Sequence, residues 1–196
     1  MKNKIKIIVI LMLVVLSSMV LSSCGEASQL DKFYKKMEKA DSYTAVITME
    51  ASIFGKVVMT TKIDGNKQYI SSILDDNEEY KEIVDGKVFI YTKNYFGEWE
   101  KELEKVDDSN DKDDDSLRKM FDSKNYDYSK KEKAFILKKD SDLDDFNGME
   151  ILSFKVIIDG ETCSIEGEVV SEGMAIPITI VIKNINKTTV TLPEVK

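Results

Sequence analysis

The sequence predicts an α+β domain built on a curved, mostly antiparallel meander sheet, an incomplete β-barrel with one N-terminal amphipathic helix and one short inserted helix. Apolar residues recur at helical spacing over residues 29–40, and from residue 43 onward they alternate with a period of two. Asp-Gly pairs at residues 64–65, 85–86 and 159–160 separate alternating segments, as expected for strands joined by tight hairpins.

The N-terminal segment has the order of a secretory signal. Lys2, Lys4 and Lys6 form a positive end, and an almost unbroken apolar run over residues 7–16 follows. An uncleaved segment over residues 5–21 would be just long enough to span a bilayer as a helix, and this alternative stays open.

The tetrapeptide Leu21-Ser22-Ser23-Cys24 follows the apolar run and resembles the bacterial lipobox, in which a leucine and two small residues precede an invariant cysteine. By that resemblance, Cys24 carries a thioether-linked diacylglyceryl group and becomes the first residue after cleavage. The membrane is then a partner through this lipid, and the expected location is the extracytoplasmic face of the cell membrane. The expected divisions are a signal peptide over residues 1–23, an anchor and short tether over 24–27, and a single domain over 28–196.

Composition excludes several classes of function. The chain carries a net charge of −8, and a signal peptide with three lysines and no acid would leave the rest more negative still. Such an acidic body disfavours nucleic acid as a partner. The chain has no histidine, which removes Ser-His-Asp and Cys-His catalysis and histidine-based zinc sites. We therefore expect no enzyme and no cofactor.

Residues 29–40 are expected to form the N-terminal helix. Ser28 with Asp31 three positions later matches a helix-capping pattern. The apolar positions of this helix share one face and are Leu30, Phe33, Tyr34 and Met37. Such an apolar stripe is typical of a helix that packs against the rest of its domain.

The first strands are expected to place their apolar residues on one face. Residues 43–51 put Tyr43, Ala45, Ile47 and Met49 together, and the following segment does the same with Val57, Met59, Thr61 and Ile63. Further strands of this half are expected over residues 68–74, 80–84 and 87–93. Gly97 then bends the chain before Trp99, the only tryptophan.

Residues 107–116 are expected to form a solvated acidic loop, because six aspartates stand there beside one lysine. A weaker alternative is a calcium loop, whose ligands would be Asp111, Asp113, Asp115 and Asp122. Ser116 stands where such a loop has its glycine, which disfavours it. Leu117, Met120 and Phe121 follow at helical spacing and predict the short inserted helix.

The last part of the chain alternates most clearly. Strands are expected over residues 133–139, 151–159, 161–170, 175–183 and 188–192, with an acidic turn or short helix over 141–146. The total is eight to ten strands. Cys163 has no disulfide partner when Cys24 is acylated, and we expect it to be a small buried residue on a strand.

A resemblance to a known family rests on the order of these segments. A lipobox precedes one amphipathic helix ending in KADSYTAVITMEAS, and turn-punctuated strands follow, with GKVFIYTKNYFGEWEK, an insert and a final ITIVIKNINKTTVTLPEVK. This order resembles bacterial lipoproteins of the LolA/LolB and LppX type, whose incomplete β-barrel wraps around a helix and has an apolar concave face. The resemblance implies binding of an acyl chain, a lipoprotein or another apolar partner.

Two hypotheses for function follow. In the first, the protein is a non-catalytic binding module, and an apolar ligand meets a wall formed between helix and sheet by Phe33, Tyr34, Met37, Tyr91, Phe96 and Trp99. In the second, these side chains are ordinary core, and the protein is a structural or interaction lipoprotein with a filled interior and no small-molecule ligand.

Overall fold

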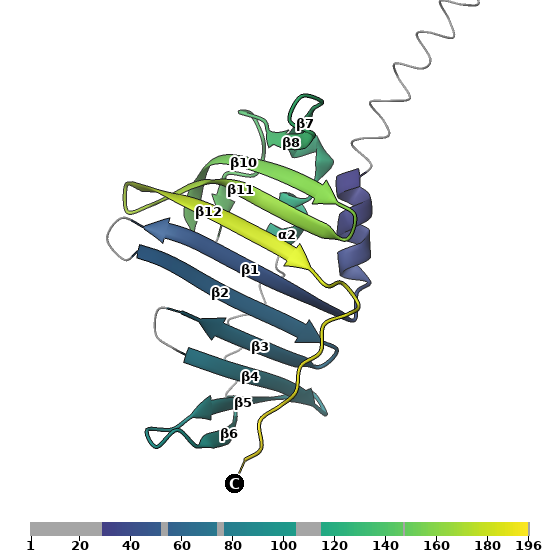
Figure 1. Cartoon of the computed structure of the whole chain (residues 1–196). Coiled ribbons are helices and arrows are strands. Elements are labelled where there is room, and N and C mark those ends of the chain that lie inside the picture. Colours follow the sequence, from purple (N-terminus) through teal and green to yellow (C-terminus); the bar gives the residue numbers. More distant parts are fainter. Residues whose placement is uncertain (1–28, 52–54, 74–76, 105–114, 147, 196) are drawn as a thin grey trace, which may run out of the picture.

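The computed structural model describes residues 29–51, 55–73, 77–104, 115–146 and 148–195. Within them the chain forms an open, curved, antiparallel sheet with little helix (Figure 1). The strands are β1 (Ser42–Ala51), β2 (Gly55–Asp64), β3 (Lys67–Ser72), β4 (Asn77–Val84), β5 (Lys87–Lys93), β6 (Trp99–Leu103), β7 (Tyr126–Ser129), β8 (Ala134–Leu137), β9 (Asp145–Phe146), β10 (Met149–Asp159), β11 (Thr162–Ser171) and β12 (Met174–Lys183).

Two meanders meet in the middle of the sheet. The strand order is β6-β5-β4-β3-β2-β1-β12-β11-β10-β8-β7, with β9 paired to β10 outside this path. Neighbours along the chain pair through tight turns, and Asp85 and Gly86 both have positive φ, 52° and 73°, as a type I′ hairpin requires. Two pairings in the path join strands that are not consecutive: β8 pairs with β10, and β1 pairs with β12, with Thr44 opposite Lys183.

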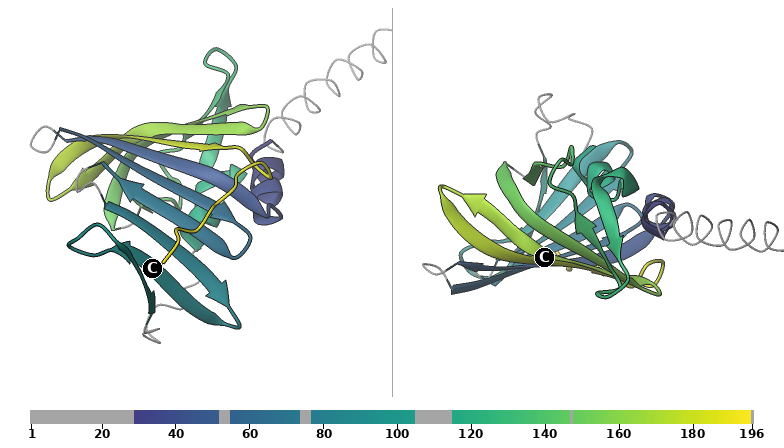
Figure 2. Two further views of the ribbon diagram at one scale, coloured as in Figure 1. Left: turned by 60° about the horizontal axis from the view of Figure 1, so that its bottom comes forward. Right: turned by 90° about the horizontal axis from the view of Figure 1, so that it is seen from above.

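The two faces of the sheet differ in composition. On the inner face stand alternate residues of β1, including Ile47, with their partners across the sheet, such as Met59 and Ile180. Because cross-strand partners share a face, this register extends from β10 to β6. The inner face is concave, and α2 (Asp115–Met120) lies on that side (Figure 2). We call the opposite surface the outer face.

The hydrophobic core lies on one half of the inner face. A helix over residues 29–38 contributes Leu30, Phe33 and Met37, and the ring of Phe33 lies 5.5 Å from that of Phe121. The sheet contributes fully buried residues that include Phe154, Val156, Cys163, Ile165 and Val169. Every strand that supplies this core belongs to β7–β12 or, with partly buried side chains, to β1.

The sequence prediction fails at two points in the sheet. The sheet has twelve strands rather than eight to ten, because the chain after Gly97 forms β6, residues 126–129 form β7, and the expected acidic turn contributes the two-residue strand β9. Residues 188–192, expected to be a strand, pair with no other strand. Asn184 and Asn186, both with positive φ, turn the chain out of the sheet after β12.

The C-terminal segment instead crosses the outer face (Figure 1). Hydrogen bonds to side chains hold this segment in place, whereas a strand would be held by backbone hydrogen bonds. Thr188 Oγ1 lies 2.8 Å from Thr44 Oγ1 on β1, and the Val190 amide donates to Asp64 Oδ2 at the end of β2, at 2.9 Å. Thr44, Thr188 and Val190 are buried by this contact. The segment therefore covers part of the outer face without adding a strand.

Candidate functional site

The inner face over β2–β6 contributes no described residue to the contiguous hydrophobic core, although Val57 of β2 is itself buried. Strands β2–β5 nevertheless place apolar side chains there, interspersed with polar ones such as Gln68, Glu79 and Lys81. The apolar inner-face residues are Val57, Met59, Ile63, Ile70, Ile83, Val88 and Ile90. Most are partly exposed, and Ile83 is 52% exposed. The inner face of β2–β5 thus carries partly exposed apolar side chains outside the core.

Charged groups lie within this half of the inner face, on β4, and along its border, on β6. The edge strand β6 points Glu100 and Glu102 to the inner face, and Glu104 follows in the same register. Lys81 of β4 lies 3.5 Å from Glu79 and 3.2 Å from Glu104. Carboxylates outnumber cations along this border, so the apolar strip ends at a negatively charged rim.

The structure does not gather the six aromatic and methionine residues expected to form one wall. Phe33 and Met37 are buried in the core, and Tyr34 lies beside them at its edge. Tyr91 and Trp99 belong to the outer face, because their registers pair them with Tyr80 and Lys93. Phe96 stands 84% exposed at the tip of the β5–β6 hairpin. The space between helix and sheet is filled by core side chains.

A row of aromatic rings crosses the outer face instead. Tyr69, Tyr80 and Tyr91 are neighbours in register on β3, β4 and β5. The ring of Tyr80 lies 4.9 Å from that of Tyr69 and 5.2 Å from that of Trp99. Such cross-strand aromatic pairs stabilise the sheet on its outer face.

Ion pairs and hydrogen bonds hold these rings in place. Tyr91 donates to Glu82, and Lys101 contacts the same carboxylate, so the pKa of Glu82 is lowered, chiefly by the tyrosine hydrogen bond. The pKa of Glu78 is lowered by hydrogen bonds from Lys93 and then Tyr69. Because each of these polar groups already has a partner, this surface is a satisfied structural network.

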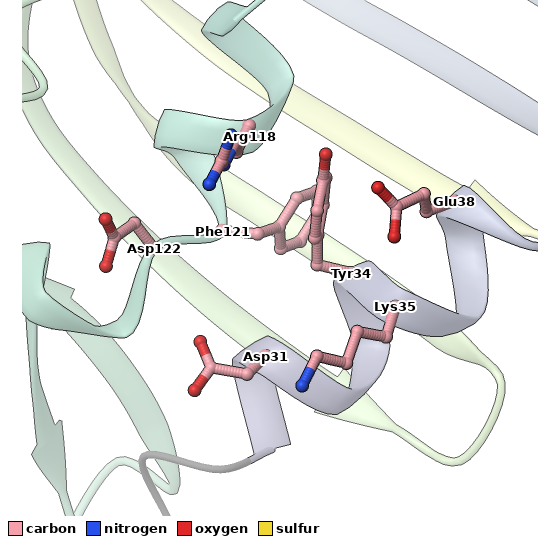
Figure 3. A pocket seen from close by; sticks show the side chains of 7 residues that line it. All are labelled: Asp31, Tyr34, Lys35, Glu38, Arg118, Phe121 and Asp122. Atoms are coloured by element: carbon pink, nitrogen blue, oxygen red, sulfur yellow. The ribbon is translucent and has the colours of Figure 1, made fainter.

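A pocket of about 400 Å3 opens between the N-terminal helix and the segment that includes α2 (Figure 3). Its lining residues are Asp31, Tyr34, Lys35, Glu38, Arg118, Phe121 and Asp122. Phe121 is 1% exposed and forms the floor, with the Tyr34 ring 6.3 Å away. In the view of Figure 3, the Tyr34 ring stands between the Arg118 guanidinium and the Glu38 carboxylate.

The charged groups of the pocket fall into two sets. Asp31 accepts a hydrogen bond from Ser123 at 3.3 Å, and Asp122 caps the short helix η2 (Ser123–Asn125) by accepting from the Lys124 amide. Arg118, Lys35 and Glu38 make no ion pair with any other described residue. The pocket therefore offers free charges of both signs beside two aromatic rings.

A clamp on the far side of the helix fixes one wall of this pocket. Glu161, in the β10–β11 turn, lies 2.9 Å from Lys36 Nζ of the helix and 2.6 Å from Lys187 Nζ. The hydrogen bond from Lys187, followed by that from Lys36, lowers the pKa of Glu161 to about 2. The clamp joins the helix, the β10–β11 turn and the C-terminal segment.

Several predicted site residues lie outside the described residues. Leu21, Ser22, Ser23 and Cys24 of the expected anchor are among them, as are Asp111 and Asp113 of the weaker calcium alternative. Asp115 is described only through its backbone, at the start of α2. In the part of the chain that the structure describes, no group of three acidic, cysteine or histidine side chains could hold a metal ion.

No helix among the described residues has the length and apolar character needed to cross a membrane. Cys163 is buried, as expected, and burial raises the pKa of its thiol to about 12.

Sequence reasoning missed the pocket. Arg118 is the only arginine of the chain, and that was the available signal. Neither a protein-family model nor a curated protein matches this chain.

Proposed function

We propose that the protein is a lipid-anchored, extracytoplasmic, non-catalytic binding protein, and that the inner face of β2–β6 takes up the acyl chain of an amphiphile. Cys24 would carry the anchor, and the curved sheet would act as the incomplete barrel of the resembled lipoproteins. One observation carries the proposal: the core cluster ends at β1, although β2, β3, β4 and β5 each still place at least one apolar side chain on the inner face.

Physical chemistry supports an acyl chain as the occupant. Each methylene removed from water contributes about 0.8 kcal/mol, so a chain lying across β2–β5 gains several kcal/mol from burial alone. The apolar residues extend from Val57 on β2 to Ile90 on β5, with the Glu79–Lys81 ion pair of β4 between Ile70 and Ile90, and the carboxylates of β6 follow. An elongated apolar ligand with a polar end matches such a strip better than a compact one.

The alternative, a structural lipoprotein that docks to other envelope proteins, has its own support. The space between helix and sheet is filled, as that hypothesis expects. It leaves the apolar residues of β2–β5 without a role, because an outer-face docking surface would not require them. For this reason we place it second.

Fluorescent fatty-acid binding tests the proposal with matched isoleucines. Ile70 and Ile90 lie on the inner face, whereas Ile73, 69% exposed, follows β3 beyond the paired region. Burial of one isoleucine contributes about 1.5–3 kcal/mol, so Ile70→Asn or Ile90→Asn is expected to raise the Kd roughly 10- to 100-fold. Ile73→Asn is expected to leave it unchanged.

Native mass spectrometry of the same proteins provides the second readout, since wild-type protein should retain co-purified lipid. A clean apo mass without fatty-acid binding would favour the structural alternative. The anchor is tested separately, because incorporation of a clickable fatty acid should be lost in Cys24→Ala. Equal labelling of that variant would contradict the lipid anchor without bearing on the sheet.

A further inference from the structure

The pocket between the N-terminal helix and α2 is a second site, and its chemistry points to a different part of a ligand. We propose that it binds a zwitterion that carries a phosphate and a primary amine, the chemistry of an ethanolamine phospholipid headgroup. The inference rests on the proposed function in one respect, since membrane anchoring is what would bring such a headgroup within reach.

The anionic half of the ligand is assigned from the Arg118 guanidinium. Arg118 lines the pocket from α2 and makes no ion pair with a described residue, whereas Lys35 lines it from the N-terminal helix and in Figure 3 lies on the Asp31 side, away from Arg118. A guanidinium binds phosphate oxygens through two parallel hydrogen bonds, and the Lys35 ammonium adds only a more distant positive charge. Phosphate is therefore the group expected at this end.

The cationic half follows from the opposite end of the pocket. Glu38 has no described partner, and in Figure 3 it lies across the Tyr34 ring from Arg118. A primary ammonium there would meet a carboxylate and the face or edge of an aromatic ring, both of which attract cations. The Tyr34 and Phe121 rings also exclude water from one side of the bound group.

The balance of charge excludes a simple anion as the better ligand. Asp31 and Glu38 line the pocket with two cations, and the third carboxylate, Asp122, is already paired with Lys124 at 3.4 Å, so the pocket has no excess of positive charge. The whole chain is also acidic, with a net charge of −8. An anionic ligand without an amine would be attracted by Arg118 but repelled by its surroundings, whereas a zwitterion satisfies both.

The volume fits a headgroup rather than a whole lipid. About 400 Å3 lies at the lower end of the range for small-molecule sites. The helix that forms one wall is described from residue 29, so few residues separate the pocket from Cys24. A headgroup in the bilayer surface would be close to this opening if Cys24 carries a lipid.

Chemical modification of the single arginine gives a direct test in the full-length lipidated protein. The protein is placed in nanodiscs of phosphatidylglycerol alone or with phosphatidylethanolamine, and the rate of phenylglyoxal addition to Arg118 is followed by mass spectrometry. We expect the phosphatidylethanolamine discs to slow the addition about tenfold, because occupancy shields the guanidinium. Glu38→Gln should abolish this difference. Lys119→Gln is the control, because it removes the charge of an exposed residue next to Arg118 on α2, and it should keep the difference.

Soluble probes distinguish the source of the zwitterion. Free phosphoethanolamine added to phosphatidylglycerol discs should also protect Arg118, and protection by it but not by the lipid would assign the site to a soluble ligand of the same chemistry. Equal rates under all conditions would overturn the proposal, as would protection by inorganic phosphate equal to that by phosphoethanolamine. Neither result would alter fatty-acid binding on β2–β5, so the two proposals fail independently.

Discussion

Gly167 should be among the residues of β11 least tolerant of substitution. It lies on the inner face, where Phe154 is its partner on β10 and Ile178 its partner on β12. A methyl carbon added at this position would stand 2.5 Å from Phe154 Cδ1 and 2.9 Å from the Ser153 carbonyl carbon, and closer still to the Ser153 oxygen. The backbone of β10 must therefore move to admit even an alanine.

The loss of stability in Gly167→Ala depends on which atoms must move to admit the methyl group. Overpacking a well-packed interior costs roughly 1–3 kcal/mol, and the upper end applies here because one of the clashing groups is backbone. The β10–β11 pairing already shifts register between Ile151 and Ser153, so we expect the β10 backbone to accommodate little further displacement there. For a chain of this size, about 3 kcal/mol corresponds to a decrease in Tm of roughly 6–12 °C.

Urea unfolding followed by circular dichroism measures this change, and a double-mutant cycle separates its two causes. Phe154→Ala alone leaves a cavity and should cost about 3–5 kcal/mol. In that background Gly167→Ala should cost less than in the wild type, because the ring clash is gone, yet it should still destabilise through the Ser153 carbonyl. A change below about 0.5 kcal/mol for Gly167→Ala alone would refute this account of the packing.

The remaining predictions concern the contacts that hold the helix and the C-terminal segment. The folded-state pKa of Glu161 is about 2, below its ordinary value of 4.5, so the stability that its clamp contributes is present above pH 4.5 and is lost as the pH falls toward 2. Glu161→Gln should remove that part of the pH dependence in thermal melts between pH 2 and 6, and an unchanged pH profile would show that the clamp contributes nothing. Asp64→Ala removes the acceptor of the buried Val190 amide and should cost about 1–3 kcal/mol, with faster hydrogen exchange at residues 188–190; protection equal to the wild type would contradict the crossing described for this segment.

The sequence predicted the meander well because its signals are local. The Asp-Gly turns and the alternation of β1, β2 and β12 determine both the hairpins and the inner face, and the cross-strand register Ile47–Met59 follows from them. The C-terminal segment was mispredicted because TTVTL has strand propensity, whereas its path depends on Thr44 and Asp64, more than a hundred residues earlier.

The candidate site was less predictable for the same reason. Tyr91 and Trp99 are residue types that suit a ligand wall. Alternate residues of a strand point to opposite faces, however, and the strand pairings across the sheet decide which face each residue takes. Those pairings place Tyr91 and Trp99 on the outer face. The pocket depends on α2 meeting the N-terminal helix, two elements about 80 residues apart, and no local pattern reports that contact.

The most direct test of the central proposal asks which face of the sheet an acyl chain touches. A fatty acid carrying a nitroxide spin label is added to the protein, and line broadening of methyl resonances is followed by NMR spectroscopy. The account predicts strong broadening at Met59, Ile70 and Ile90 on the inner face, with Val58 and Ile73 little affected. Equal broadening on both faces, or none at saturating ligand, would contradict it.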